Sequence, residues 1–396
     1  MKNLLSPASH GPKITWFILG RESLLSAAEI AAVLNLKKIR YTGGQILKNS
    51  GPVNSSLMDR LGGTIKIGRE LAADVDETGL MEAIEIELKK LPGKINFGLS
   101  LYGSEANSIK QIQKLGLTIK NNLKNTGLSV RFVFNDEIAL SSVSVQKNGL
   151  LEKGREFLME KNGERYNLAV TEAVQPFEQF SARDYGRPGR DDVSGMLPPK
   201  LALMMLNLAA PESGTVILDP FCGSGTILTE ATRLGFTRLI GADLSAKAIA
   251  DTEKNFSWLK LKSPKLFQGD VADLSKKISL QSVDAIVTEP FLGRPLQGRE
   301  IKEFLIRQLN GLKPTYLTAF SEFKKILKPN GTVVMIIPKY RFKNDWLELN
   351  LTKEIKKLGF AAQPLLQTES QTYTSLLYAR PSQHVGREIW KFTLLK

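Results

Sequence analysis

Two glycines follow an aspartate at a point where a buried strand is expected to give way to a helix. In "VILDPFCGSGTILTEA" an apolar run ends at Asp219, Gly223 and Gly225 follow it, and a helix is expected to begin near Thr226. Glycine lets the backbone approach a ligand closely, and the free N–H groups at a helix start favour an anionic group such as a carboxylate. The segment therefore predicts a cradle for a small charged ligand.

Two further aspartates narrow the choice of ligand. Asp243 ends the next apolar run, where a carboxylate can accept hydrogen bonds from both hydroxyls of a ribose. Asp270 ends the run after that, where it can receive an adenine amino group, and Asp219 can face an ammonium group. S-adenosylmethionine has an amino acid end, a ribose and an adenine, so we expect it to be the cofactor. The predicted donor-binding set also includes Phe221, Thr226, Leu244 and Val271.

Other interpretations of these residues stay open. A dinucleotide would need a third glycine, and Leu228 stands at that position; NAD would also present a pyrophosphate to the helix. Each aspartate can instead cap a helix or lie on the surface, and Ser245 competes with Asp243 for the cap of the helix that follows. Cys222 lies in the loop without a histidine nearby in sequence, so we expect a packed side chain rather than a nucleophile.

Composition limits the class of protein. A length of 396 residues favours two or three domains, and a net charge of +14 is compatible with a nucleic acid partner. One cysteine and two histidines leave no internal disulfide and no Cys/His zinc cluster, so no metal is expected. The sequence has no run of eighteen apolar residues and no convincing signal peptide. We therefore expect a soluble, cytoplasmic protein that does not enter a membrane.

The elements that must position the cradle change character along the chain. The first 180 residues mix short strands with amphipathic helices, including a predicted helix over residues 108–127. From Val193 onward, strands and helices alternate, which is typical of a mostly parallel, doubly wound sheet. A further helix is expected over residues 346–359. The apolar runs at 361–369 and 374–380 then suggest a terminal hairpin with one antiparallel strand.

The glycine segment, "SGMLPPKLALMMLNLA" before it and "LGGTIKIG" in the N-terminal half together resemble a known family. The chain is similar to the THUMP-domain tRNA guanosine-N2 methyltransferases of archaea and eukaryotes, which modify the guanosine at position ten of tRNA. The resemblance implies an N-terminal ferredoxin-like domain at residues 1–75, a THUMP RNA-binding domain at 76–180 and a linker at 181–195. A class I methyltransferase domain with a Rossmann-like, doubly wound sheet and a C-terminal antiparallel hairpin would occupy residues 196–396.

The same resemblance assigns site residues and partners. Met196 and Lys200 would lie against the methionine end of the donor. The family's catalytic tetrapeptide begins with Asp or Asn, followed by two prolines and an aromatic residue, and this chain departs from it. Its matching positions are Thr288, Glu289, Pro290 and Phe291. The partners implied are tRNA and, as in eukaryotic relatives, a small partner subunit.

The departure leads to a hypothesis about mechanism. An exocyclic guanine amine is a weak nucleophile, so hydrogen-bond acceptors at its protons and an aromatic ring against the base assist the transfer. A threonine hydroxyl is a weaker acceptor than a carboxylate. We therefore expect Glu289 to supply the carboxylate one position later than in the family, and Phe291 to stack on the base.

Several functions remain open from the sequence. The alternatives are a catalytically impaired tRNA-binding protein that keeps the donor pocket, and an amino-methyltransferase that acts on rRNA or DNA. A dehydrogenase is the weakest candidate. The following arginines are candidates to contact phosphates, with exposed surface arginines as the competing interpretation: Arg183, Arg187, Arg190, Arg294 and Arg299.

Overall fold

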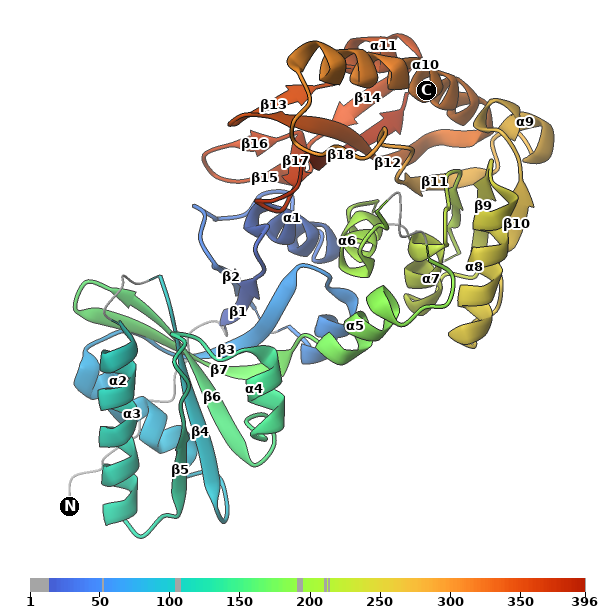
Figure 1. The fold of residues 1–396 in the computed structure, drawn as a ribbon. Helices are drawn as coiled ribbons and strands as arrows, with labels where there is room; N and C mark the ends of the chain where they lie inside the picture. Colours follow the sequence, from blue (N-terminus) through green and yellow to red (C-terminus); the bar gives the residue numbers. More distant parts are fainter. Residues whose placement is uncertain are drawn as a thin grey trace. The chain divides into compact units, whose positions relative to one another are not determined.

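The computed structural model describes residues 14–51, 53–103, 108–190, 195–209, 212 and 214–395, and these form two compact units (Figure 1). The first unit takes in residues 1–21, 43–59 and 64–177, and the second takes in 22–42, 60–63 and 178–396. Neither unit is one continuous stretch, because the chain enters the second unit twice before residue 64. The modular division at residues 75, 180 and 195 stays a prediction.

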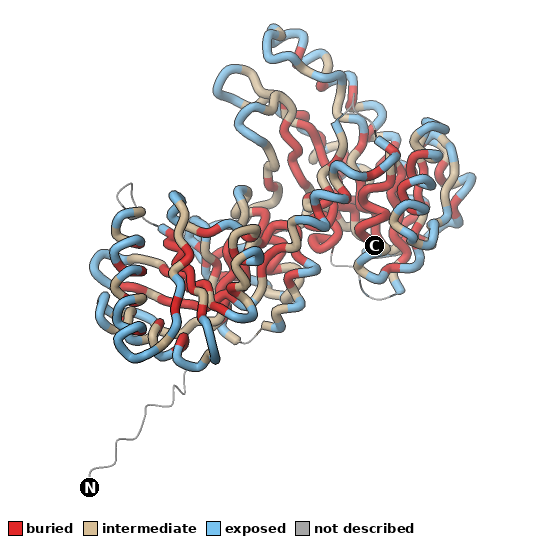
Figure 2. Tube along the Cα trace, turned by 60° about the horizontal axis from the view of Figure 1, so that its bottom comes forward, coloured by how far each residue is buried: buried red, intermediate tan, exposed pale blue. Residues whose placement is uncertain are grey.

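The first unit is a seven-stranded sheet in the order β2-β1-β3-β7-β6-β4-β5, with mixed parallel and antiparallel pairs. Its central strands are buried along most of their length, and the buried positions follow the strands in Figure 2. The elements are β1 (Ile14–Leu19), β2 (Ile46–Ser50), η1 (Ser55–Arg60), β3 (Thr64–Val75), α2 (Glu77–Leu88), β4 (Ile95–Tyr102), α3 (Ser108–Asn125), β5 (Val130–Val133), α4 (Ser142–Lys147), β6 (Gly154–Asn162) and β7 (Arg165–Val174).

Helix α3 forms within the predicted range, and its buried face packs on the sheet through Ile112, Ile119 and Leu123. On the opposite face, Lys114 and Lys124 are exposed. This arrangement is that of an amphipathic helix with a solvated basic face.

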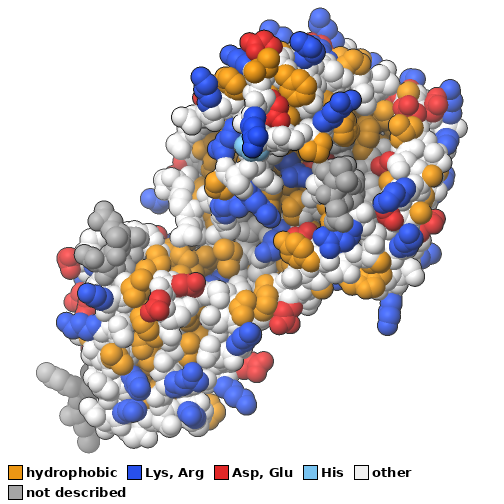
Figure 3. Space-filling model, viewed as in Figure 1, with side chains coloured by type: hydrophobic (Ala, Val, Ile, Leu, Met, Phe, Trp, Pro, Cys, Tyr) orange, Lys and Arg blue, Asp and Glu red, His pale blue; other side chains and the backbone are white. Residues whose placement is uncertain are grey.

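On the face of the molecule that Figure 3 shows, Lys and Arg side chains are spread widely and Asp and Glu are fewer.

The second unit carries a nine-stranded sheet in the order β10-β9-β8-β11-β12-β18-β14, with β13 paired to β12 and β17 to β18. A separate pair, β15 and β16, is antiparallel. The elements are α1 (Ser23–Val33), α5 (Phe177–Tyr185), α6 (Pro199–Ala209), β8 (Val216–Asp219), α7 (Thr226–Arg233), β9 (Arg238–Asp243), α8 (Ala246–Trp258), β10 (Lys265–Gln268), η2 (Val271–Asp273), α9 (Leu274–Lys277), β11 (Val283–Thr288), α10 (Lys302–Ile326), β12 (Leu327–Phe342), β13 (Asp345–Glu348), α11 (Thr352–Lys357), β14 (Phe360–Gln363), β15 (Leu366–Gln367), β16 (Thr372–Tyr373), β17 (Ser375–Tyr378) and β18 (Val385–Leu394).

Helices cover both faces of this sheet (Figure 1). Helices α6, α7 and α8 contact one another and the strands from one side, and α9, α10 and α11 form the other layer. Leu218, Ile286 and Val333 belong to the core with α10. Strands β10, β9, β8, β11 and β12 are parallel, as a doubly wound fold requires. The predicted α/β class with a Rossmann-like sheet is therefore confirmed.

The C-terminal part confirms an antiparallel ending but differs in detail from the prediction. The predicted hairpin is reduced to the short pair Leu366–Gln367 and Thr372–Tyr373. The antiparallel strand of the main sheet is β18, which sequence analysis did not propose and which inserts between β12 and β14. The helix predicted over residues 346–359 was wrong in its first half. There the chain turns at Lys343, with φ +55°, and pairs as β13 with the end of β12.

A buried carboxylate anchors α1 within the second unit. Both oxygens of Glu29 accept backbone hydrogen bonds, from Gly62 N and Gly63 N at 2.8 Å, and Oε1 also accepts from Asn207 Nδ2 at 2.7 Å. Burial raises the pKa of Glu29 to about 7, against these donors. A side chain at Gly62 would collide with the Lys200 carbonyl, because its Cβ would lie 2.2 Å from that oxygen. The two glycines of "LGGTIKIG" thus permit α1 and α6 to pack closely.

Candidate active site

The glycine loop connects β8 to α7 in a conformation that suits glycine. Gly223 and Gly225 have φ values of +53° and +81°, and Gly225 is the N-cap of α7. A Cβ at Gly225 would lie 2.6 Å from Thr252 Cγ2, whereas one at Gly223 would meet nothing within 4 Å. Thr252 Oγ1 donates to Gly223 O at 2.8 Å, so α8 fixes the loop from behind while Gly223 borders open space.

Asp243 ends β9 and is linked directly to this loop. Its Oδ2 accepts from Gly223 N and its Oδ1 from Ser245 N, both at 2.9 Å. Ser245, not Asp243, is the N-cap of α8 and accepts from Ala248 N. The competing interpretation of Asp243 as the cap is therefore wrong. Its carboxylate is held at the carboxyl edge of the sheet, half-exposed, with lone pairs remaining on each oxygen.

Asp219 and Thr288 join two parallel strands at the same edge. Asp219 is the last residue of β8 and Thr288 the last of β11, and Thr288 Oγ1 donates to Asp219 Oδ1 at 2.6 Å. Thr288 is fully buried, so its hydroxyl serves Asp219 and is not presented at the surface. Burial raises the pKa of Asp219 to about 7, and Thr288, as a donor to the carboxylate, opposes the shift.

Glu289 follows Thr288 and is paired with a cation from the far end of the chain. Arg387 Nε on β18 donates to Glu289 Oε1 at 2.6 Å, and the two side chains are only 9% and 14% exposed. Arg387 Nη2 also donates to Gly195 O at 3.2 Å. Burial raises the pKa of Glu289, and the adjacent Arg387 lowers it.

The loop after Glu289 is held by two tyrosines. Tyr316 Oη donates to Phe291 O at 2.8 Å, and Tyr340 Oη donates to Leu292 O at 2.6 Å. The backbone of the loop is therefore fixed while the Phe291 ring remains 57% exposed. Pro290, which lies between Glu289 and Phe291, is buried. An exposed aromatic ring on a fixed backbone can stack on a planar ligand without the loop having to become ordered first.

The remaining predicted donor-binding residues differ in their contacts and in their exposure. Ser224 Oγ lies 4.0 Å from Met196 Sδ, which places Met196 against the glycine loop. The ammonium group of Lys200 lies 5.4 Å from the centroid of the Phe180 ring. Asp270 is exposed and caps η2 by accepting from Ala272 N at 2.9 Å, as the capping alternative anticipated. Phe221 is half-buried against the core, Val271 is buried and Leu244 is 67% exposed.

Comparison with known proteins places this site in a family. A model of the UPF0020 family, described as RMKL-like, methyltransferase domain, matches residues 187–368. A relative from Methanothermococcus thermolithotrophicus, named "Probable tRNA (guanine(10)-N2)-dimethyltransferase", is 33% identical over 138 residues, which are 32% of this chain and 82% of that protein. The chain belongs to the tRNA guanosine-N2 methyltransferase family.

Two more proteins show how far the likeness extends within this family and fold. The tRNA (guanine(10)-N2)-dimethyltransferase of Methanothermobacter thermautotrophicus is 37% identical over 131 residues. That match spans 33% of this chain and only 37% of the relative. The crystal structure of TrmN from Thermus thermophilus has a TM-score of 0.53 at 17% identity and covers 97% of this chain and 100% of that chain. The structural likeness shows the fold alone.

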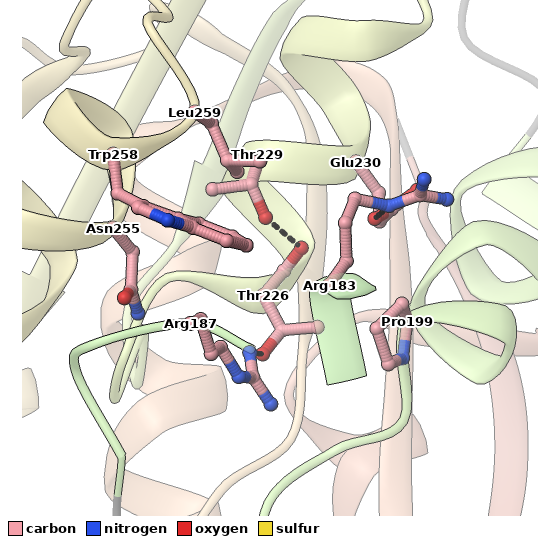
Figure 4. Close-up of a pocket in the computed structure, with 9 residues that line it drawn as sticks. All are labelled: Arg183, Arg187, Pro199, Thr226, Thr229, Glu230, Asn255, Trp258 and Leu259. Carbon is pink, nitrogen blue, oxygen red and sulfur yellow. Dashed lines mark hydrogen bonds and ion pairs between the residues drawn. The ribbon is translucent and has the colours of Figure 1, made fainter. Parts of the chain in front are cut away.

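Two of the arginines in the predicted linker are not at the surface, where the sequence analysis had expected them. Arg183 and Arg187 are 6% and 5% exposed, so neither is a surface contact for phosphates, and both competing interpretations were wrong for them. Arg183 Nε pairs with Glu230 at 2.6 Å. Arg187 Nη1 donates to Thr226 Oγ1 at the start of α7, and Figure 4 shows the two side chains together. Arg190, by contrast, is exposed.

Arg187 carries donors that the rest of the described chain does not use. Its Nε and Nη2 are buried and have no hydrogen-bond partner among the residues that the structure describes. They lie at a small cavity that Thr226, Pro199 and Trp258 also line (Figure 4). Unpaired buried donors cost about 1–3 kcal/mol each, so a cation in this setting favours an added acceptor, either an anion or a water molecule.

The sequence indicated the carboxyl edge of the sheet but missed its supporting residues. Arg387, Tyr316 and Tyr340 were not proposed, because they are 98, 25 and 48 positions from the residues they hold. The segment that forms β18 carries three charged residues among its apolar ones, Arg387, Glu388 and Lys391, and its sequence does not indicate which of them reaches the site. Within the described ranges, no group of three or more His, Cys, Asp or Glu residues could hold a metal ion. No helix in those ranges is long and apolar enough to cross a membrane.

Proposed function

We propose that this protein transfers a methyl group from S-adenosylmethionine to the exocyclic N2 amine of a guanosine in tRNA. The observation that carries the proposal is the Thr288–Asp219 hydrogen bond at 2.6 Å. It joins the end of the strand that leads into the "TEPF" loop to the end of the strand that leads into the glycine loop. A base presented at Phe291 would therefore lie next to a ligand held by Asp219 and Gly223. Relatives named as tRNA guanine-N2 methyltransferases support the choice of acceptor.

The residues present fit the donor. The buried carboxylate of Asp219 suits its ammonium group, and the half-exposed carboxylate of Asp243 suits the ribose hydroxyls. The unpaired donors of Arg187, beside Thr226 at a helix start, suit its carboxylate. Asp270, exposed at the next strand end, can accept from the adenine amino group. We place Phe221, Gly225, Leu244, Val271, Met196 and Lys200 around the same ligand as part of the proposal.

On the acceptor side, the chain supplies stacking, positioning and one carboxylate. The exposed ring of Phe291 stacks on the guanine, and the buried Thr288 orients Asp219. Arg387 Nε donates to Oε1 of Glu289, so Oε2 is the oxygen we propose as the acceptor for the amine. The amine nitrogen attacks the methyl carbon and forms the N–C bond. The pair of the broken C–S bond stays on sulfur, and the amine proton passes to Glu289 and then to solvent.

Mass spectrometry of nucleosides digested from unmodified tRNA, after incubation with the protein and S-adenosylmethionine, tests the proposal. We expect N2-methylguanosine or its dimethyl form. A methyl group found only in rRNA or DNA would assign the amino-methyltransferase alternative. Donor binding without transfer to any nucleic acid would favour the tRNA-binding alternative.

A cytoplasmic location belongs to the proposal, since tRNA is its substrate. The small partner subunit also stays a prediction. If the chain elutes alone in size-exclusion chromatography and still methylates tRNA, activity does not require a partner subunit.

Donor affinity should rise with pH because of Asp219. With a pKa of about 7, this carboxyl is mostly protonated at pH 6 and mostly ionised at pH 8, and only the carboxylate attracts the ammonium group. We expect S-adenosylhomocysteine to bind about tenfold more tightly at pH 8 than at pH 6, which calorimetry can measure. The variant Asp219→Asn should bind weakly at both pH values. An equal pH dependence in that variant would show that another group titrates.

Arg187 should matter only for ligands that possess a carboxylate. We expect Arg187→Met to weaken binding of S-adenosylhomocysteine at least about tenfold, because one charge-assisted hydrogen bond contributes about 1.5–3 kcal/mol. Methylthioadenosine, which has the nucleoside but no amino acid end, should bind both proteins equally. Arg190→Met, at an exposed arginine of the same segment, serves as the control. Equal losses for the two ligands would assign Arg187 to the fold of the linker instead.

A further inference from the structure

Strand β18 carries a side chain that reaches the candidate catalytic loop. Arg387 lies on β18, where it is opposite Pro338 of β12 and Tyr378 of β17. Its side chain is almost fully buried and connects two segments: Nε donates to Glu289 Oε1 at 2.6 Å, and Nη2 donates to Gly195 O at 3.2 Å. Gly195 immediately precedes Met196, which touches the glycine loop. One guanidinium therefore links the acceptor loop to the donor side.

The charges around Glu289 explain why such a cation is needed. Asp219 from β8 interacts unfavourably with Glu289 when both are ionised. The Tyr316 phenol from α10 adds no charge, because burial raises its pKa well above the ordinary value. Desolvation disfavours the carboxylate further, and Arg387 is the charge that opposes both effects. Without Arg387, a buried carboxyl beside another acid would take up a proton, become a weaker acceptor for the amine and no longer be able to receive the amine proton.

We infer that Arg387 is a positioning residue for methyl transfer: it holds the Glu289 carboxylate directed at the target amine. The inference rests on the proposed function and adds a residue to it. The Nε bond occupies one carboxylate oxygen and leaves the other for the amine. The bond to Gly195 fixes the guanidinium, so that the carboxylate cannot turn away with its partner.

Four variants test this role in the full-length protein: Arg387→Lys, Arg387→Met, Glu289→Gln and the double variant Glu289→Gln/Arg387→Met. Arg238→Lys is the control. Arg238 is the first residue of β9, so it lies at the amino ends of the parallel strands, away from their carboxyl ends where the site lies. For each protein, the melting temperature, the affinity for S-adenosylhomocysteine, and the pH dependence of kcat with unmodified tRNA are measured.

We expect Arg387→Met to lower kcat about tenfold at neutral pH, with the acid limb of the kcat profile moved to higher pH. Arg387→Lys should recover part of the rate and of the shift, because it keeps the charge but not the bond to Gly195. In the double variant no unpaired buried charge remains, so the melting temperature should return towards wild type while kcat stays low. Donor affinity should change less than threefold in all four variants.

A purely structural ion pair gives the opposite results. In that case kcat recovers with the melting temperature in the double variant, or the acid limb does not move in Arg387→Met; either result overturns the inference. If Arg387→Met does not fold, Arg387→Lys and the double variant still decide between the two roles. Wild-type protein that binds the donor but methylates no tRNA would contradict the proposed function itself, which separates that failure from failure of the Arg387 role.

Discussion

We expect the variant Asp243→Ala to bind S-adenosylhomocysteine at least about 100-fold more weakly than wild type, because two ribose hydroxyls lose a charged acceptor worth about 1.5–3 kcal/mol each. The same carboxylate also accepts from Gly223 N and Ser245 N at 2.9 Å. Its removal therefore takes away one of the bonds that tie the glycine loop to the end of β9, and the bond from Cys222 N to Ala242 O at 2.9 Å remains. Calorimetric titration of the purified variant measures the loss.

A conservative variant separates the two contributions of Asp243. In Asp243→Asn the amide keeps an acceptor oxygen for one backbone N–H but carries no charge, so we expect an intermediate affinity. Asp345→Ala, at an exposed aspartate that begins β13, should bind as wild type. Wild-type affinity in Asp243→Ala would show that the ligand does not contact this strand end, and the proposed donor site would then be wrong.

We expect Gly293→Ala to lower kcat for tRNA methylation about 100-fold while donor affinity stays close to wild type. Gly293 has φ +97°, and a Cβ there would lie 1.8 Å from Tyr340 Oη. The alanine must displace the phenol that donates to Leu292 O, so the loop that carries Phe291 has to move. A misplacement of about 1 Å at reacting groups costs on the order of 10²-fold in rate.

A glycine in helix α10 supplies the control for this prediction. Gly311 is inside α10, and a Cβ there would meet nothing within 4 Å. Gly311→Ala should keep full activity and stabilise the protein by up to about 1 kcal/mol, because alanine is the better helix former. Steady-state methylation assays and thermal melts of both variants check the pair. Full activity in Gly293→Ala would mean that the position of Phe291 does not limit transfer.

Together these features describe a donor side that is built locally and an acceptor side that is assembled from distant segments. The residues proposed to bind the donor follow three neighbouring parallel strands, each ending at the same edge. The acceptor loop depends on Tyr316 of α10, Tyr340 of β12 and Arg387 of β18. Changes in α10 or β18 should therefore alter catalysis without altering donor binding.

The donor edge was predictable from sequence because its order is a property of parallel sheets. Apolar runs that alternate with helices place every strand's carboxyl end on one side, so Asp219 and Asp243 had to share an edge. Glycines in the loop reflect local backbone angles, which the residue type alone constrains. The C-terminal strands were less accessible, because the turn at Lys343 and the insertion of β18 depend on pairing with distant segments.

What the amino-acid sequence determined by itself was the parallel sheet, the glycine loop and the aspartates at the strand ends, because local periodicity and residue type fix these. What only the tertiary structure decided was the state of the side chains around them. Thr288 turned inward to Asp219, Arg183 and Arg187 became buried, and Arg387 crossed from the last strand to Glu289. The physical reason is that burial and charge pairing depend on which distant segments meet, and no local pattern contains that information.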